Sequence, residues 1–247
     1  WPVETSGYIV VKDYYKNGSL KELTEEYLKS NGSNNSILNP TVRSKIIFGV
    51  AAIMKKLHKL NIAHFNLTIH ILRDLTIGNI LLDDNCEPLI NNFNLVGFNK
   101  GVSFDELRFL DEPYFPENAL SMAPERIAQD KNCSLECDVF SYAIFVYLMF
   151  STKLSFPNIK ENTKNINLFL FKTFSMIADG NRYPRPNNIP DHYWELIQDC
   201  WSNDPNDRPS FDDITKKLRN DVFALKEFGN VTDLKKLHEY QNRIDKD

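Results

Sequence analysis

The most constraining feature of this sequence is the apolar run from Val139 to Met149, which has almost no polar side. At helical period such a run predicts a helix enclosed by protein, because a helix on the surface keeps a polar face. The longest uninterrupted apolar stretch, Ala143 to Phe150, is far shorter than the roughly 20 residues needed to span a bilayer. We therefore expect a water-soluble domain built around one central helix.

Most of the remaining periodicity is also helical. Thr41 to Leu60 carries apolar residues at helical spacing, which predicts a long amphipathic helix. Residues 221–247 are charged and are expected to form a helical extension that lies on the surface, frays or docks a partner. Shorter helices are predicted at Leu20–Leu28, Trp194–Cys200 and Phe211–Leu218.

Strand signals are few and lie near the start of the chain. Tyr8 to Val11 is a short β-branched run and predicts a strand. Ile80–Leu82 and Leu89–Ile90 predict two more strands, joined by a tight turn at Asp83–Asn85. The sequence thus predicts a mainly helical domain with one strand and one hairpin.

Composition limits the class of protein. The 247 residues, 42% hydrophobic and 25% charged, suffice for one substantial domain or two small ones. A net charge of −4 gives no electrostatic reason to expect nucleic acid as the main partner. The cysteines and histidines lack metal-site spacing, and the first residues lack the regions of a signal peptide. These features predict a cytoplasmic protein with reduced thiols and without nucleic-acid or membrane partners.

Several short motifs follow one another along the chain. Leu72 to Asn79 reads LRDLTIGN, which matches H-R-D-L-x-x-x-N at each fixed position except the first. The others are YIVVKDYYKNGSL at 8–20, Leu57-His58 with Ile62-Ala63-His64, INNFNL at 90–95, MAPE at 122–125, DVFS at 138–141 and CWxxDPxxRPSF at 200–211.

The order and spacing of these motifs over residues 8–218 resemble the protein kinase family, and the last motif resembles its tyrosine-kinase-like group. The resemblance implies an α+β, mainly α fold, with a kinase hinge strand and C-terminal lobe over residues 1–220 and the extension over 221–247. In this family the Gly-rich loop and its lysine precede the hinge, and neither occurs in the seven residues before Tyr8. The N-terminal lobe is therefore expected to be largely absent from the sequence.

The resemblance also implies roles for particular residues. Phosphoryl transfer needs positioned phosphates, metal ions and a carboxylate that accepts the proton of the substrate hydroxyl. Asp74 matches that carboxylate, Arg73 its neighbour in the motif and Asn79 a metal ligand, although Asp and Asn in a loop are also ordinary turn formers. The positions implied for binding ATP are Asp13, Tyr14, Tyr15 and Leu81.

Two positions depart from the family in ways that affect the metal and the phosphate. Asn92 stands where the family has the aspartate that chelates Mg²⁺, so both implied metal positions, Asn79 and Asn92, carry neutral amides. Thr76 replaces the lysine that steadies the transferring phosphate in serine/threonine kinases. Removing a full charge beside a divalent ion costs on the order of several kcal/mol. The sequence therefore predicts that binding of ATP and Mg²⁺ is weak or absent.

The catalytic loop contains a local repeat. Leu67-Thr68-Ile69 recurs as Leu75-Thr76-Ile77, and the simplest interpretation is an eight-residue duplication that splits the motif into two partial copies. Either the loop bulges outward, or the end of the long helix and Asp74 no longer share one geometry. An error of about 1 Å in positioning lowers a rate by roughly 100-fold.

The residues that hold the lobe together match the family better. Glu125 and Arg208 match residues that form a buried ion pair, and Asp138 matches a helix residue that bonds the backbone of the catalytic loop. Two functions follow from the resemblance. One is a catalytically impaired pseudokinase that acts by binding another protein, such as a kinase or signalling protein. The other is an ATP-dependent serine/threonine kinase of the tyrosine-kinase-like group, a transferase whose N-terminal lobe is missing from this chain.

Overall fold

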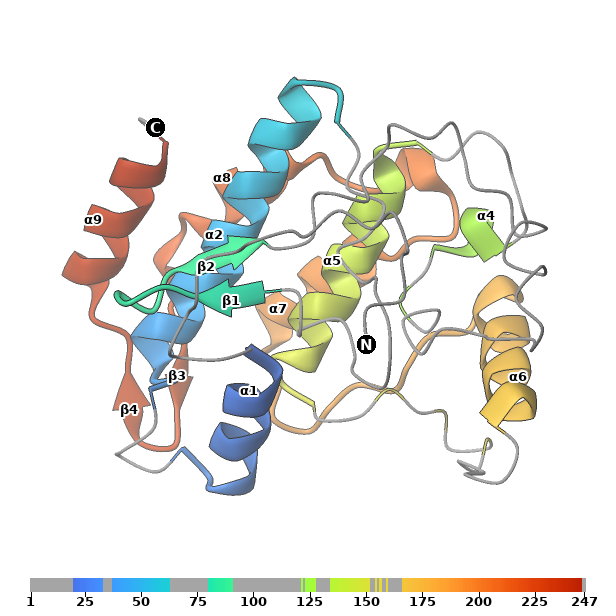
Figure 1. Cartoon of the computed structure of the whole chain (residues 1–247), viewed down its shortest axis with the longest axis horizontal. Coiled ribbons are helices and arrows are strands. Elements are labelled where there is room, and N and C mark those ends of the chain that lie inside the picture. The colour runs from blue at the N-terminus through green and yellow to red at the C-terminus, as the bar shows by residue number, and fades with distance from the viewer. Residues whose placement is uncertain are drawn as a thin grey trace, which may run out of the picture.

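The computed structural model describes residues 20–32, 37–62, 80–90, 121, 123–127, 134–151, 154, 156, 159 and 166–245. The predicted strand at Tyr8 to Val11 lies outside these ranges. Helices and strands follow in the order α1 (Leu20–Lys29), α2 (Pro40–Lys59), β1 (Ile80–Leu82), β2 (Pro88–Ile90), α4 (Pro124–Ile127), α5 (Glu136–Leu148), α6 (Ile166–Ala178), α7 (Asp191–Cys200), α8 (Phe211–Leu218), β3 (Lys226–Glu227), β4 (Asn230–Val231) and α9 (Leu234–Ile244), with short 3₁₀ turns at Pro205–Asp207 and Asp221–Phe223 (Figure 1).

Helix α5 runs through the middle of the molecule, between α2 and α6 (Figure 1). Every residue from Cys137 to Leu148 is buried, which confirms the central helix that the apolar run predicts. Its polar side chains bond to backbone groups of the elements around it. The Tyr142 hydroxyl donates to the Ile47 carbonyl of α2 at 2.9 Å, and Tyr147 donates to Pro184 at 2.9 Å.

Helix α2 confirms the predicted amphipathic helix and begins one residue earlier than the periodicity suggests. Asn39 is its N-cap, with the side chain accepting a hydrogen bond from the Val42 amide at 3.1 Å, and Pro40 occupies the first turn. Basic side chains in the last turn complement the negative end of the helix dipole. One face of α2 contacts α8 and α9, so this helix joins the centre of the fold to the C-terminal region.

The predicted hairpin is present as the antiparallel pair β1–β2. Ile80 pairs with Ile90 and Leu82 with Pro88, so the chain enters and leaves the hairpin at the same end. Asp83 organises the turn, because its carboxylate accepts from the amides of Asn85 and Glu87, both at 2.8 Å. The turn is longer than predicted.

The C-terminal region corrects one expectation. The sequence predicts a helical extension from Asp221 onward. Its first part instead forms a 3₁₀ turn and the antiparallel pair β3–β4, so the prediction is wrong there and is confirmed only for α9. The hairpin forms because Phe228 and Gly229 both adopt positive φ, at 50° and 78°, as a two-residue turn requires. Helix α9 lies against α2 at the left of Figure 1.

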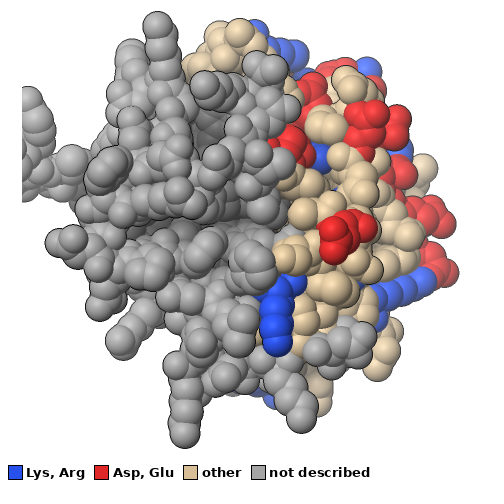
Figure 2. Space-filling view, turned by 90° about the vertical axis from the view of Figure 1, so that its right-hand side faces the viewer, with Lys and Arg blue, Asp and Glu red and all other residues tan. Residues whose placement is uncertain are grey.

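The described part of the chain is mostly helical, with two two-stranded sheets, as expected for the C-terminal lobe of a kinase. None of its helices combines the length and apolar character required to cross a membrane. On the face shown in Figure 2, acidic and basic side chains are interspersed over the described surface, with no continuous basic patch.

Candidate functional site

The hairpin β1–β2 carries the one predicted ATP-binding residue that the structure describes. Leu81 is partly exposed, whereas its neighbours Ile80 and Leu82 are buried, because successive strand residues point to opposite faces. Its cross-strand partner Leu89 is also partly exposed. The two leucines offer an apolar surface of the kind that a flat adenine ring contacts. Asp13, Tyr14 and Tyr15 lie outside the described residues.

The predicted catalytic and metal residues Arg73, Asp74, Asn79 and Asn92 also lie outside the described residues. Two of them, Asn79 and Asn92, are nevertheless close in sequence to the ends of the hairpin β1–β2. Asn79 directly precedes Ile80, and Asn92 follows Ile90 by two residues. Because Ile80 and Ile90 are paired, both amide positions continue from the same end of the hairpin.

The residue types at the two positions that the resemblance assigns to the metal differ from the ligands that Mg²⁺ prefers. The ion is a hard cation that is usually held in kinase sites by at least one carboxylate, together with phosphate oxygens. Asn79 and Asn92 supply only neutral amide oxygens. Within the described ranges, no group of three or more His, Cys, Asp or Glu side chains is arranged to hold a metal.

Asp138 anchors the end of α2 to α5. It is fully buried in the first turn of α5, and its carboxylate lies 3.0 Å from Nε2 of His58 in the last turn of α2. The His58 ring packs edge-on against Phe211 of α8, with 4.8 Å between centroids. The contact expected between Asp138 and the catalytic loop involves loop residues that lie outside the described ranges. The pairing with His58 was not predicted, although the Leu57-His58 motif marked that position.

The ion pair expected between Glu125 and Arg208 is present and has fork geometry. Nη1 and Nη2 of Arg208 donate to the two carboxylate oxygens of Glu125 at 2.6 and 2.9 Å. The remaining donors reach the carbonyls of Ser202 at 3.0 Å and Glu136 at 2.9 Å. Burial alone would raise the pKa of Glu125, but the hydrogen bonds and charge of Arg208 outweigh it and lower that pKa below its ordinary value. The pair joins the A-P-E motif to the closing motif of the lobe.

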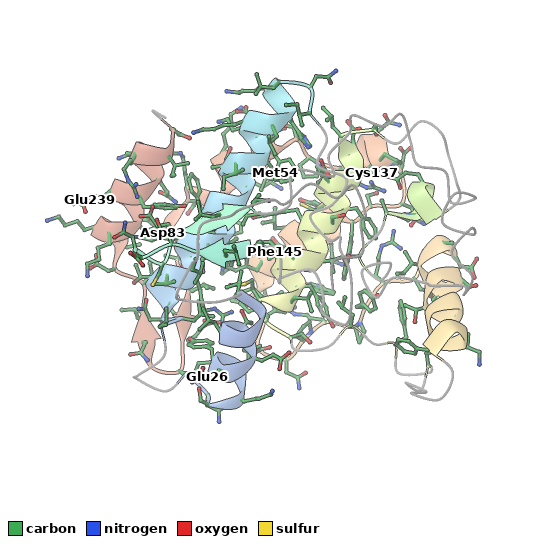
Figure 3. The ribbon with its side chains drawn as sticks, viewed as in Figure 1. Glu26, Met54, Asp83, Cys137, Phe145 and Glu239 are labelled. Carbon is green, nitrogen blue, oxygen red and sulfur yellow. The ribbon has the colours of Figure 1, made fainter. Side chains whose placement is uncertain are left out.

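Two side chains beside this ion pair were missed from the sequence. The Cys137 thiol, near the upper end of α5 in Figure 3, donates to Glu125 at 3.2 Å. Arg182 lies 5.1 Å from the centre of the Phe140 ring, which Arg208 also contacts at 5.2 Å. Burial, and next the charge of Arg208, lower the pKa of Arg182 to about 10. No motif contains Arg182, so only the packed structure brings it to this cluster.

Comparison with known proteins identifies the family. Residues 2–218 match the family model described as "Protein tyrosine and serine/threonine kinase". The chain belongs to the protein kinase family. This match covers all the motifs of the sequence, and the hairpin, the central helix and the Glu125–Arg208 pair are therefore parts of a kinase domain.

Similar proteins include some named as probable serine/threonine-protein kinases and one named as a receptor. The chain is 29% identical over 225 residues to a probable serine/threonine-protein kinase of Dictyostelium discoideum, covering 88% of this chain and 23% of that protein. It is 30% identical over 191 residues to the probable serine/threonine-protein kinase roco9 of the same organism, covering 75% and 5%. It is 28% identical over 237 residues to ephrin type-A receptor 5 of Rattus norvegicus, covering 91% and 20%. The chain thus spans less than a quarter of the length of each of these relatives.

Proposed function

We propose that this kinase domain is catalytically impaired and acts by binding another protein, such as a kinase or signalling protein in the cytoplasm. The observation that carries the proposal is Asn92 at the position of the metal-chelating aspartate. A neutral amide there leaves the triphosphate of ATP poorly neutralised, because phosphoryl transfer depends on metal ions beside the phosphates. Binding of ATP and Mg²⁺ is accordingly weak or absent in this proposal.

The intact scaffold supports a binding role. The Glu125–Arg208 fork and the Asp138–His58 bond hold the lobe together, whereas Thr76, Asn92 and the duplicated loop segment alter positions that serve the chemistry. A domain that keeps its shape but loses its metal ligand can still present a surface to a partner.

The second candidate is an active serine/threonine kinase of the tyrosine-kinase-like group. Arg73, Asp74 and Asn79 keep the residue types of the catalytic motif, and two of the relatives are named as probable serine/threonine-protein kinases. In this candidate Asp74 accepts the proton of the substrate hydroxyl.

Thermal unfolding with ATP, in the presence and absence of Mg²⁺, separates the two candidates. We expect no magnesium-dependent rise in melting temperature for the wild-type protein and a clear rise for Asn92→Asp. Ligand at 100 times its dissociation constant stabilises by about 2.7 kcal/mol, which is readily measured. Asn91→Asp is the matched control, since it adds the same charge one residue away.

The opposite result supports the active kinase. A magnesium-dependent rise in the wild-type protein, together with phosphate transfer that Asp74→Ala abolishes, would reject the proposed impairment.

A further inference from the structure

The described chain continues past the end of the kinase family match. That match ends at residue 218, whereas residues 219–245 form a 3₁₀ turn, the hairpin β3–β4 and helix α9. We call residues 219–245 the C-terminal clamp. It contacts α1, α2 and the hairpin β1–β2. The hairpin carries Leu81, the described residue of the candidate ATP site.

The clamp grips α1 through the turn of β3–β4. The Phe228 ring packs edge-on against Tyr27 of α1, with 5.6 Å between centroids. It also covers Gly32 just after α1, where a Cβ atom would lie 2.5 Å from Phe228 Cδ2. Phe228 is held at φ 50°, a region that costs a bulky residue roughly 1–3 kcal/mol.

A buried charge reinforces the same grip. Arg43 of α2 is completely buried, and its Nε lies 3.3 Å from the carboxylate of Glu227 in β3. Glu227 also accepts a hydrogen bond from the Tyr27 hydroxyl at 3.2 Å. The clamp thereby supplies the carboxylate that faces Arg43, and this carboxylate ties α1 to α2.

The clamp grips the hairpin β1–β2 through α9. Tyr240 and Pro88 of β2 meet over Gly49 of α2, where an added Cβ would collide with the Tyr240 hydroxyl and lie 2.6 Å from Pro88 Cγ. Arg243 forms an ion pair with Glu87, next to the start of β2. Glycine at residue 49 is therefore what lets α2, α9 and β2 approach so closely.

Hydrogen bonds seat the clamp on the rest of the lobe. Gln241 donates to the Leu218 carbonyl at 3.3 Å, and Arg219 donates to the Gln241 carbonyl at 3.0 Å, so α8 and α9 cap each other. The hydroxyls of Ser44 and Thr232 lie 3.1 Å apart in a buried contact between α2 and the clamp.

From these contacts we infer that the clamp is a conformational device that fixes α1 and the hairpin β1–β2 against α2. Phe228 is the positioning residue for α1, and Tyr240 is the positioning residue for the hairpin. Helix α1 follows the segment predicted to be the hinge. The hairpin β1–β2 carries Leu81 and lies between Asn79 and Asn92 in the sequence. The inference is independent of catalysis, because it concerns the placement of these elements whether or not ATP binds.

Hydrogen exchange of backbone amides, measured on the whole chain by mass spectrometry, tests the two grips separately. Tyr240→Ala is expected to speed exchange in residues 80–90 by about tenfold and to leave residues 20–29 unchanged. Phe228→Asn is expected to do the reverse, since Asn tolerates positive φ but lacks the ring. Glu239→Ala is the matched control, because Glu239 is exposed on α9 and points away from the molecule (Figure 3).

A second route covers the case in which Tyr240→Ala does not fold. Gly49→Ala should speed exchange in both residues 80–90 and α9, and adding Tyr240→Phe should restore part of the protection by removing the colliding hydroxyl. A purely general loss of stability gives no such rescue. The inference is overturned if the variants speed exchange equally across the protein, including α7, or if neither affects its assigned element.

Discussion

Two buried arginines stabilise this fold in different ways. Both lie in the part matched by the kinase family, but Arg208 faces Glu125 of the same part, whereas Arg43 faces Glu227 of the C-terminal clamp. Each faces a glutamate from a distant segment and an aromatic ring. Arg208 directs its guanidinium donors at oxygen atoms. Arg43 donates to the Met149 carbonyl, but within the described residues its Nε and Nη1 have no hydrogen-bond acceptor.

The protonation of the partners reflects this difference. The pKa of Glu125 is lowered because Arg208 overcomes the effect of burial. The pKa of Glu227 is raised because burial prevails over the charge of Arg43, and burial likewise lowers the pKa of Arg43. Arg43 is instead stabilised by packing, with its guanidinium 4.6 Å from the Tyr27 ring centre and 5.4 Å from that of Phe150. Hydrogen bonds thus secure one arginine and aromatic packing the other.

The largest expected effect comes from Arg208→Met. It leaves Glu125 with the Cys137 thiol as a side-chain donor and removes Arg208 from the carbonyls of Ser202 and Glu136. Breaking a buried pair from one side costs about 3–5 kcal/mol. Arg43→Met should cost less, because Glu227 can accept a proton more readily. Urea unfolding at neutral pH measures both, with the exposed pair variant Lys217→Met as a control that loses at most about 1 kcal/mol. Equal losses in the free energy of unfolding for Arg208→Met and Arg43→Met would contradict the proposed difference between the two ion pairs.

Replacing both members of each pair sharpens the comparison. Arg43→Met with Glu227→Leu should change stability little, because exchanging a buried pair for apolar residues can gain about 1–4 kcal/mol. That gain offsets the partners that the Met149 carbonyl and the Tyr27 hydroxyl lose. Arg208→Met with Glu125→Leu should still destabilise, because the carbonyls of Ser202 and Glu136 lose their donor. The free energy of unfolding of both double variants decides this, and a loss in the first pair would show that its charge matters more than its packing.

The smallest expected effect is a difference in pH dependence. Glu125, with a folded pKa below its ordinary 4.5, contributes stability above that pH and loses it as the pH falls through the folded pKa. Glu227, with a folded pKa above 4.5, costs stability as the pH rises through the folded pKa. The cost of Glu125→Gln should therefore grow from pH 3 to pH 7, while that of Glu227→Gln should shrink. Parallel curves would contradict the opposite pKa shifts.

Local pattern and motif predict the kinase part of this fold well. The central helix and the hairpin β1–β2 follow from side-chain periodicity, and the Glu125–Arg208 pair follows from two motifs. The hairpin β3–β4 was missed because each strand has two residues and its turn places Phe, an unusual residue, at positive φ. The pairing of Arg43 with Glu227 joins residues far apart in sequence, and only packing brings them together. The catalytic assignments at Arg73, Asp74, Asn79 and Asn92 stay predictions.

The close packing of Tyr240 and Pro88 on Gly49 affects the order in which parts of the protein can fold during translation. Glycine inside a helix weakens it by roughly 0.5–1 kcal/mol relative to alanine, so α2 depends on neighbours for its stability. Two of these neighbours, Glu227 and Tyr240, follow α2 by more than 160 residues in the sequence and therefore leave the ribosome well after it. We therefore expect α2 and Arg43 to lack their native packing in nascent chains until α9 has emerged.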